Sequence, residues 1–435
     1  MTKKNPSRSM HRPRTVSALA LAVALAGTAC SASEKEPSNP APSEEETQLE
    51  IFSWWTASGE ADGLLALFEY FERDHEAVRI VNAAVEGGAG VNAKEELAAR
   101  MSDGDPPDAF QVHAGRELID TWVESGAVEP VTFMFEENGW LDQYPPDLIE
   151  ILSQDGEIWS VPVNIHRSNV LFANGAALDS VGAEPPATWD DFFAIAGELT
   201  DAGITPLALG DQEPWAATHL FESLLLSTLG ADAYAGLWNG ETAWSSVEVT
   251  EALELFERVL GHIGEDHAEL TWDEAAEQVS QGSAAMTVMG DWAEGYFKSA
   301  GRVLGVEIVW APSPGTAGAF LMLSDSFALP EGAPERGNAV DWLRVCGSAG
   351  GQDAFNPLKG SIPARLDADR SLYDAYLTSA MDDFSRDRLV PSVTHGAAAA
   401  PEWSATLVET IAEFVASPDV EATQARLVAA ADDAS

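Results

Sequence analysis

Cysteine is scarce in this chain, whose 435 residues include only Cys30 and Cys346. If Cys30 belongs to an N-terminal leader, as its surroundings indicate below, Cys346 has no partner and no internal disulfide can form. Cysteine and histidine also do not occur at the spacing of a metal site. We therefore expect a fold without disulfides, metals or other cofactors.

Basic residues are scarce too, with 23 Lys and Arg against 71 Asp and Glu and a formal net charge of -48. Such a field repels phosphate backbones and anionic lipids, so it disfavours nucleic acids and anionic substrates as partners. It does not indicate a cationic ligand, because an acidic surface more often serves solvation. A salt-rich habitat would produce the same bias.

Motifs of common enzymes are missing. No G-x-S-x-G elbow of a serine hydrolase occurs. The run Gly87-Gly88-Ala89-Gly90 lacks the spacing and the lysine of phosphate-binding loops, and we interpret it as a tight connection between a strand and a helix. A glycoside hydrolase needs only two carboxylates, and 71 acidic residues always provide a pair. The residues leave that alternative open, and we assign no catalytic residue.

The N-terminus resembles the leader of a bacterial lipoprotein. Basic residues precede the apolar stretch 16–26, which is too short to span a bilayer, and small residues lead into Cys30. We predict a signal peptide over residues 1–30 and a lipid anchor on Cys30, although Gly27 and Ala29 also suit ordinary signal peptidase. Residues 31–48, rich in Ser, Pro and Glu, are predicted to be a disordered tether.

The body of the chain begins with strands that alternate with helices. The expected elements are a strand at 49–55, a helix at 60–75, a strand at 78–85, a helix at 92–102 and a strand at 109–112. This order predicts a mainly parallel sheet, in which ligands bind beyond the carboxyl ends of the strands. The loops after Trp55 and around residues 111–113 are therefore the first candidates for a site.

The length of the chain suggests two domains. We expect residues 158–165 to cross between lobes. Further elements are predicted as helices at 190–202, 215–229, 247–260 and 272–281, strands at 306–310 and 320–329, and a helical C-terminus interrupted by loops at 357–365 and 391–396.

A group of residues suits the recognition of a sugar, which takes aromatic faces and planar polar groups inside a cleft. Trp54, Trp55 and Glu60 lie within seven residues. Adjacent residues of an extended segment point to opposite faces, so one tryptophan can pack inward while the other meets a ligand. Lys359, one of only six lysines, and His395 lie in loops with glycine neighbours. Each residue alone is explained equally well by packing or solvation.

Several stretches together resemble a family. They are Trp54-Trp55-Thr-x-Ser-Gly-Glu60, Pro106-Pro107-Asp108-Ala-Phe-Gln111-Val-His113, Val161-Pro-Val-Asn164-Ile-His166-Arg167, Thr188-Trp189-Asp-Asp-Phe192, Ala285-Met286-x-x-Met289-Gly290-Asp291-Trp292, Asp325-Ser326-Phe327 and Lys359-Gly-Ser-Ile-Pro363-Ala-Arg365. In this order they resemble the glucose/mannose-type solute-binding proteins of bacterial ABC sugar importers, within extracellular solute-binding protein family 1. The similarity covers about residues 49–395.

The resemblance implies an α/β, two-lobed periplasmic-binding-protein fold of the type II, Venus-flytrap kind, with the ligand cleft between the lobes. The lobes would comprise residues 49–160 with 311–360 and residues 161–310 with 361–435. The implied sugar-binding residues are Trp55, Glu60, Gln111, His113, Trp272, Trp292, Asp325, Lys359 and His395. Packing or contacts between lobes explain four more equally well: Trp54, His166, Trp244 and Asp291. We further expect Asp325 and Lys359 to neutralise one another when the cleft closes.

The resemblance also implies the function. The chain would be a non-enzymatic, exported binding protein at the periplasmic or extracellular face of the cytoplasmic membrane, touching the membrane only through its lipid anchor. It would work as a monomer and deliver a neutral monosaccharide, glucose above galactose or mannose, to the permease subunits of an ABC importer. Xylose or a disaccharide, a sugar receptor for chemotaxis or a sensor kinase, and a lipoprotein glycosidase remain the alternatives.

Overall fold

A parallel three-stranded arrangement begins the part of the chain that the computed structural model describes, residues 47–433. Strand β1 (Thr47–Ser53) pairs in parallel with β2 (Val78–Ala84) and with β3 (Ala109–His113). Helices α1 (Ser58–Glu72) and α2 (Val91–Asp103) connect them. The predicted alternation is confirmed here by the order of these elements, and α1 buries Leu64, Leu67, Phe68 and Phe71 at helical spacing. The leader predicted for residues 1–30, Cys30 and residues 31–46 of the predicted tether lie outside the described residues. The last two residues of that tether, Thr47 and Gln48, instead begin β1, because they pair with β2.

The same sheet continues with antiparallel strands. Strand β14 (Asp325–Pro330) pairs antiparallel with β3, β4 (Val128–Glu129) and β7 (Ser160–Pro162). The prediction of a mainly parallel sheet is therefore wrong for the sheet as a whole. A strand–helix–strand connection makes neighbours parallel, but β14 arrives from a segment about two hundred positions later and enters in the opposite direction.

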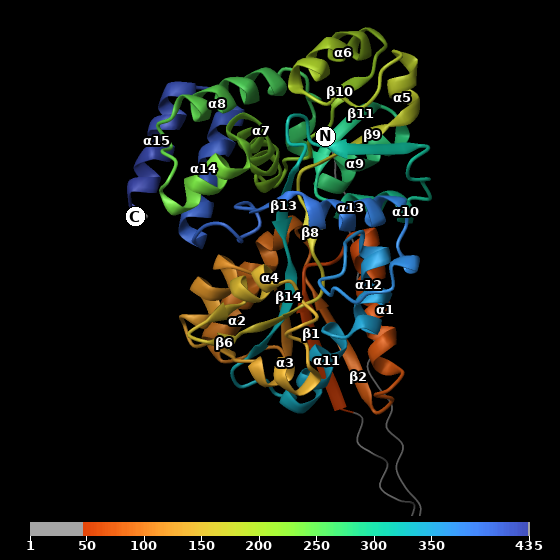
Figure 1. The fold of residues 1–435 in the computed structure, drawn as a ribbon, viewed down its shortest axis with the longest axis vertical. Coiled ribbons are helices and arrows are strands. Elements are labelled where there is room, and N and C mark those ends of the chain that lie inside the picture. Colours follow the sequence, from red (N-terminus) through yellow and green to blue (C-terminus); the bar gives the residue numbers. More distant parts are fainter. Residues whose placement is uncertain (1–46, 434–435) are drawn as a thin grey trace, which may run out of the picture. The chain divides into compact units, whose positions relative to one another are not determined.

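Two further sheets are separate from the first. One has the order β10 (Thr205–Leu207), β11 (Ala284–Met289), β9 (Val170–Asn174) and β12 (Ile308–Pro312). The other has the order β15 (Arg388–Pro391), β13 (Ala319–Leu323) and β8 (His166–Arg167). Figure 1 shows these strands among helices α5 (Gly175–Ser180), α6 (Trp189–Asp201), α7 (Trp215–Asn239, interrupted at Gly230), α8 (Val247–Leu260), α9 (Trp272–Gln281), α10 (Trp292–Ser299), α13 (Ala375–Arg386), α14 (Pro401–Ala416) and α15 (Val420–Asp433).

We call the first sheet and its helices the first lobe, and the other two sheets with the helices just named the second lobe. Besides α1 and α2, the first lobe holds α3 (Thr132–Asn138), α4 (Pro146–Ile151), α11 (Arg336–Cys346) and α12 (Ala349–Lys359), while β5 (Ser153–Gln154) and β6 (Glu157–Ile158) form a hairpin of their own (Figure 1). Residues 163–165 lead from β7 in the first sheet to β8 in the third, which confirms the predicted crossing.

A second crossing overturns one predicted element. The single strand expected at 320–329 is two strands, β13 and β14, which belong to different sheets. Between them Ser324 donates its hydroxyl to the carbonyl oxygen of Asn164 (2.7 Å), and the backbone N–H of Asp325 donates to Asn164 Oδ1 (2.8 Å). The two crossing segments are thus joined by hydrogen bonds. The polar residues Ser324, Asp325 and Ser326 mark the point where the chain passes from one sheet to the other, and the predicted strand ran across them.

A helix end replaces part of a predicted loop. Residues 357–359, expected in a loop, form the last turn of α12, which ends at Gly360 with a φ of 81°. Lys359 is therefore held on a helix. None of the helices within residues 47–433 has the length and apolar character of a membrane span.

Candidate functional site

A cavity of about 350 Å3 lies between the two lobes. It is lined by Trp54, Trp55, Glu60, Gly88, Ala89, His113, His166, Trp215, Trp272, Trp292, Leu323, Asp325, Lys359 and His395. Only about 30 Å3 of this volume is free for the centre of a water molecule, because the side chains of the two lobes fill most of the site and part of the remainder is open to solvent. The lining is mainly aromatic, with two carboxylates, one lysine and three histidines.

The first-lobe wall comes from the carboxyl ends of the parallel strands. Trp54 and Trp55 follow β1, Gly88 and Ala89 follow β2, and His113 ends β3. This is the edge where ligands were expected. Both tryptophans line the cavity, whereas only one was expected to face a ligand, because the segment after Ser53 has left the regular strand geometry.

The second-lobe wall is built from helix starts. Trp215, Trp272 and Trp292 are the first residues of α7, α9 and α10. Thr271 caps α9 through a reciprocal bond with Glu274, which fixes where Trp272 emerges. Three indoles therefore converge on one cavity from three elements.

Lys359 and Glu60 form the central ion pair of the cavity. Lys359 Nζ donates to Glu60 Oε1 over 3.0 Å and lies 5.7 Å and 5.8 Å from the ring centroids of Trp55 and Trp292. Burial raises the pKa of Glu60, and Lys359 opposes that rise. Lys359 also lowers the pKa of Asp325, with which mutual neutralisation was expected, but its ammonium forms the direct ion pair with Glu60 because α12 packs against α1.

Asp325 has a different set of partners. It accepts hydrogen bonds from Gln111 Nε2 (2.9 Å) and Asn164 Nδ2 (2.8 Å), and its Oδ2 lies 3.4 Å from His166 Nε2. Burial would raise the pKa of Asp325, but His166 and Lys359 outweigh burial and hold it well below its usual range. This carboxylate is therefore ionised and fixed in orientation.

His166 lies between two carboxylates. Its Nδ1 bonds Asp291 and its Nε2 faces Asp325, while the other oxygen of Asp291 accepts from the backbone N–H of Arg167 (3.0 Å). Burial and Lys359 lower the pKa of His166, and the two carboxylates outweigh them and raise it. Asp291 thus holds the histidine from behind without lining the cavity.

A chain of histidines forms the remaining wall. His395 Nε2 lies 3.1 Å from His219 Nδ1, and the His395 ring lies 5.1 Å from Trp292 and 5.7 Å from His113. Burial lowers the pKa of both His219, to about 4, and His395. Because one neutral imidazole can donate a hydrogen bond to the other, the contact between His219 and His395 holds the His395 loop against α7.

The Nδ1 side of the His113 ring is held by Glu117 and, through it, by Lys94. His113 Nδ1 lies 2.9 Å from Glu117 Oε2, which also pairs with Lys94 Nζ at 2.8 Å. Burial would raise the pKa of Glu117, but Lys94 and His113 outweigh it and lower that pKa to about 2. Nε2 of His113 is left to face Asp325 (3.7 Å) and the cavity.

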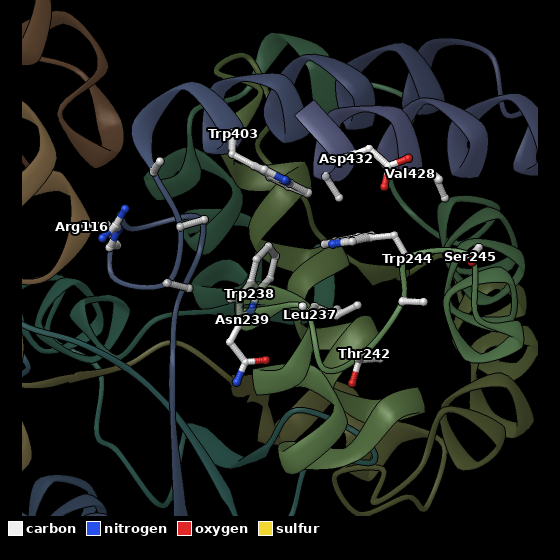
Figure 2. A pocket seen from close by; sticks show the side chains of 16 residues that line it. Arg116, Leu237, Trp238, Asn239, Thr242, Trp244, Ser245, Trp403, Val428 and Asp432 are labelled. Carbon is white, nitrogen blue, oxygen red and sulfur yellow. The ribbon is translucent and has the colours of Figure 1, made fainter. Parts of the chain in front are cut away.

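The structure brings together most of the predicted site. Of the nine implied residues, all except Gln111 line the cavity, and Gln111 lies behind Asp325. Of the four others, Trp54 and His166 line it and Asp291 stands behind His166. Trp244 lies elsewhere, in a pocket beside Trp238 and Trp403, with ring centroids 5.4 Å and 4.9 Å from its own (Figure 2).

Four lining residues were not predicted: Gly88, Ala89, Trp215 and Leu323. Gly88 and Ala89 had been interpreted only as a connection. The position of Trp215 at the start of a helix could have suggested that it lines the cavity. The same criterion would also have chosen Trp189 at the start of α6, which packs on Phe192 instead. No group of three or more His, Cys, Asp or Glu side chains that suits a metal ion occurs among residues 47–433.

The arrangement suits an uncharged ligand with many hydroxyls. Indole faces pack on C–H surfaces, ionised carboxylates accept, and an ammonium donates. Glu60 already pairs with Lys359 and Asp325 with His166, so a charged ligand would have to compete with these pairs.

Comparison with known proteins agrees with this chemistry. Residues 57–353 match the family model described as bacterial extracellular solute-binding protein. The chain is 37% identical over 395 residues to an uncharacterized ABC transporter extracellular-binding protein of Pyrococcus horikoshii (90% of this chain, 89% of the relative). It is 33% identical over 365 residues to a probable sugar-binding periplasmic protein of Brucella melitensis (82% and 85%).

A solved structure is similar in fold. It is that of the bacterial solute receptor AcbH, which has an exclusive substrate preference for β-D-galactopyranose, with a TM-score of 0.78, 18% identity, and coverage of 89% of this chain and 98% of that chain. The similarity in fold therefore extends over most of this chain. By the span of the family model and by these relatives, the chain belongs to the family of bacterial extracellular solute-binding proteins.

Proposed function

We propose that this chain captures a neutral monosaccharide, glucose above galactose or mannose, and delivers it to an ABC importer without catalysing a reaction. The observation that carries the proposal is a small cavity whose aromatic walls enclose an internally compensated set of charges, Glu60 with Lys359 and Asp325 with His166. The sugar-binding relative and the galactose receptor described above support a sugar as the ligand.

Each of the nine residues expected to bind the sugar then has a role. Trp55, Trp272 and Trp292 supply faces for the C–H surfaces of the ring. Glu60, Asp325 and Lys359 bond hydroxyls, and His113 and His395 supply further ring nitrogens. Gln111 is a positioning residue, because its amide joins Asp325 Oδ1 to the backbone N–H of Trp54 (3.1 Å).

The remaining parts of the proposal concern the whole protein. The lobes would close on the sugar by bending at the crossing segments. Their expected bounds, residues 49–160 with 311–360 and 161–310 with 361–435, differ from the sheets at β7, which belongs to the first lobe, and at β13, which belongs to the second. The chain would act as a monomer, be held at the outer face of the cytoplasmic membrane by a lipid on Cys30, and meet permease subunits there.

Calorimetry of the purified chain against glucose, galactose, mannose, xylose and maltose tests the proposal. We expect saturable binding of one hexose and no turnover of chromogenic glycosides. Turnover without saturable binding of any free sugar would support a glycosidase and overturn the proposal. Tightest binding of xylose or maltose would keep the class and correct the sugar.

A further inference from the structure

Glu213 joins the two lobes at the edge of the cavity. Its Oε2 accepts a hydrogen bond from the backbone N–H of Gly88 (2.7 Å) and another from Trp215 Nε1 (3.1 Å). Gly88 belongs to the first lobe, whereas Glu213 and Trp215 belong to the second. One carboxylate thus connects two residues that line the cavity from opposite sides.

Gly88 has a steric reason to be glycine. A Cβ at this position would lie 2.6 Å from Glu213 Oε2 and 2.7 Å from Trp215 Nε1, below any real contact distance. The backbone of Gly88 does not adopt the left-handed region, in contrast to Gly87 and Gly90 on either side. The nearest atoms that an alanine at 88 would meet are therefore side-chain atoms of Glu213 and Trp215, both in the second lobe.

A larger space begins on the other side of this contact. A groove of about 1210 Å3 shares Trp54, Glu60, Gly88 and Trp272 with the cavity, and Glu213 lines the groove. The cavity is less than a third as large, at about 350 Å3. Gly88 lines both the cavity and the groove, Trp215 lines the cavity, and Glu213 lines the groove. The Glu213 carboxylate, which bonds both Gly88 and Trp215, therefore lies at the boundary between the two spaces.

We infer that Glu213 is a specificity-determining residue, which closes the cavity around a single sugar unit and excludes a second unit from continuing into the groove. The inference rests on the proposed function. A ligand that reached from the cavity into the groove would have to separate the carboxylate from Gly88, and the bond between them would be lost.

The test compares four variants with the wild type, using calorimetry against glucose, galactose and xylose and against maltose, cellobiose and lactose. Glu213→Ala removes the carboxylate, and Gly88→Ala obstructs its approach. Glu213→Gln keeps an oxygen that accepts from Gly88. Glu265→Ala, which removes an exposed carboxylate from the same lobe outside both spaces, is the control.

We expect the wild type to bind one monosaccharide and no disaccharide. Glu213→Ala and Gly88→Ala should bind that monosaccharide about 10- to 100-fold more weakly, the effect of losing a hydrogen bond to a charged group. Glu213→Ala should also gain binding of a disaccharide containing the same sugar. Glu213→Gln should retain most of the affinity, and Glu265→Ala all of it. Thermal unfolding without sugar shows that each variant folds.

The outcomes separate the two proposals. A wild type that binds no sugar overturns the proposed function. If the wild type binds a monosaccharide and also the matching disaccharide, only the role of Glu213 is overturned. The same holds if Glu213→Ala keeps the affinity for the monosaccharide and still excludes disaccharides. Should Glu213→Ala not fold, Gly88→Ala decides the same question from the other lobe.

Discussion

At the scale of single residues, the cavity depends on charges that burial would not tolerate alone. Lys359 is 1% exposed and touches the rings of Trp55 and Trp292 as well as Glu60. Both members of the ion pair belong to the first lobe. The ion pair therefore stabilises the first lobe, and it also holds the two side chains in place where they line the cavity.

Lys359→Met should lower the free energy of unfolding by roughly 3–5 kcal/mol, because it leaves the Glu60 carboxylate buried without a cation. It should also weaken sugar binding about tenfold or more through the lost donor. Adding Glu60→Gln should restore part of the stability but not the affinity. Urea unfolding and calorimetry measure the two effects, and a double variant no more stable than the single one would contradict the assigned pairing.

His219 makes a prediction about pH. Burial lowers its pKa from an ordinary value of 6.5 to about 4, so between these values the unfolded chain binds a proton that the folded chain does not. Stability is then complete above pH 6.5 and is lost as the pH falls toward 4, by on the order of 3 kcal/mol.

Urea unfolding of the wild type and of His219→Gln from pH 7.5 to 4.5 tests this contribution. The difference in unfolding free energy between the two should shrink as the pH falls, since the variant cannot take up that proton. A constant difference would show that His219 titrates alike in both states.

At the scale of elements, helix α10 brings the backbones of the two lobes close together. It lies against α1 and α12 (Figure 1). A Cβ on Gly295 would lie 2.6 Å from the carbonyl oxygen of Lys359, and one on Gly59 would lie 2.5 Å from the carbonyl carbon of Gly295. Here backbone meets backbone, so no side chain can move aside.

Gly295→Ala should therefore prevent closure while leaving the free protein folded, because alanine favours a helix over glycine by about 1 kcal/mol. We expect sugar affinity to fall at least about tenfold and the radius of gyration from small-angle scattering not to decrease on adding sugar. Gly197→Ala in α6 is the matched control, since a Cβ there meets nothing within 4 Å. Full affinity in Gly295→Ala would contradict this role of α10.

At the scale of the whole molecule, the net charge of -48 acts against compactness. Salt shortens the range of this repulsion, to about 3 Å at 1 M. The midpoint of thermal unfolding should rise by several degrees between 0.02 M and 1 M sodium chloride. Scanning calorimetry checks this, and a midpoint that falls or stays constant would show that local ion pairs outweigh the repulsion.

The sequence alone determines the parts of this protein that depend on local pattern. Helical spacing of apolar residues predicts α1, and the strand that precedes it places Trp55 and Glu60 at a sheet edge. Likewise β3 carries His113 to the same edge. These assignments hold because a strand end and the first turn of a helix are set by residues only a few positions apart.

Only the tertiary structure decides which residues meet across long separations. It pairs Lys359 with Glu60, places Trp215 on the cavity and places Trp244 in another pocket. It also divides the single strand predicted at 320–329 into β13 and β14, which belong to different sheets. The sequence pattern of a buried residue does not reveal which residue it contacts. That partner is fixed only when segments hundreds of positions apart pack together.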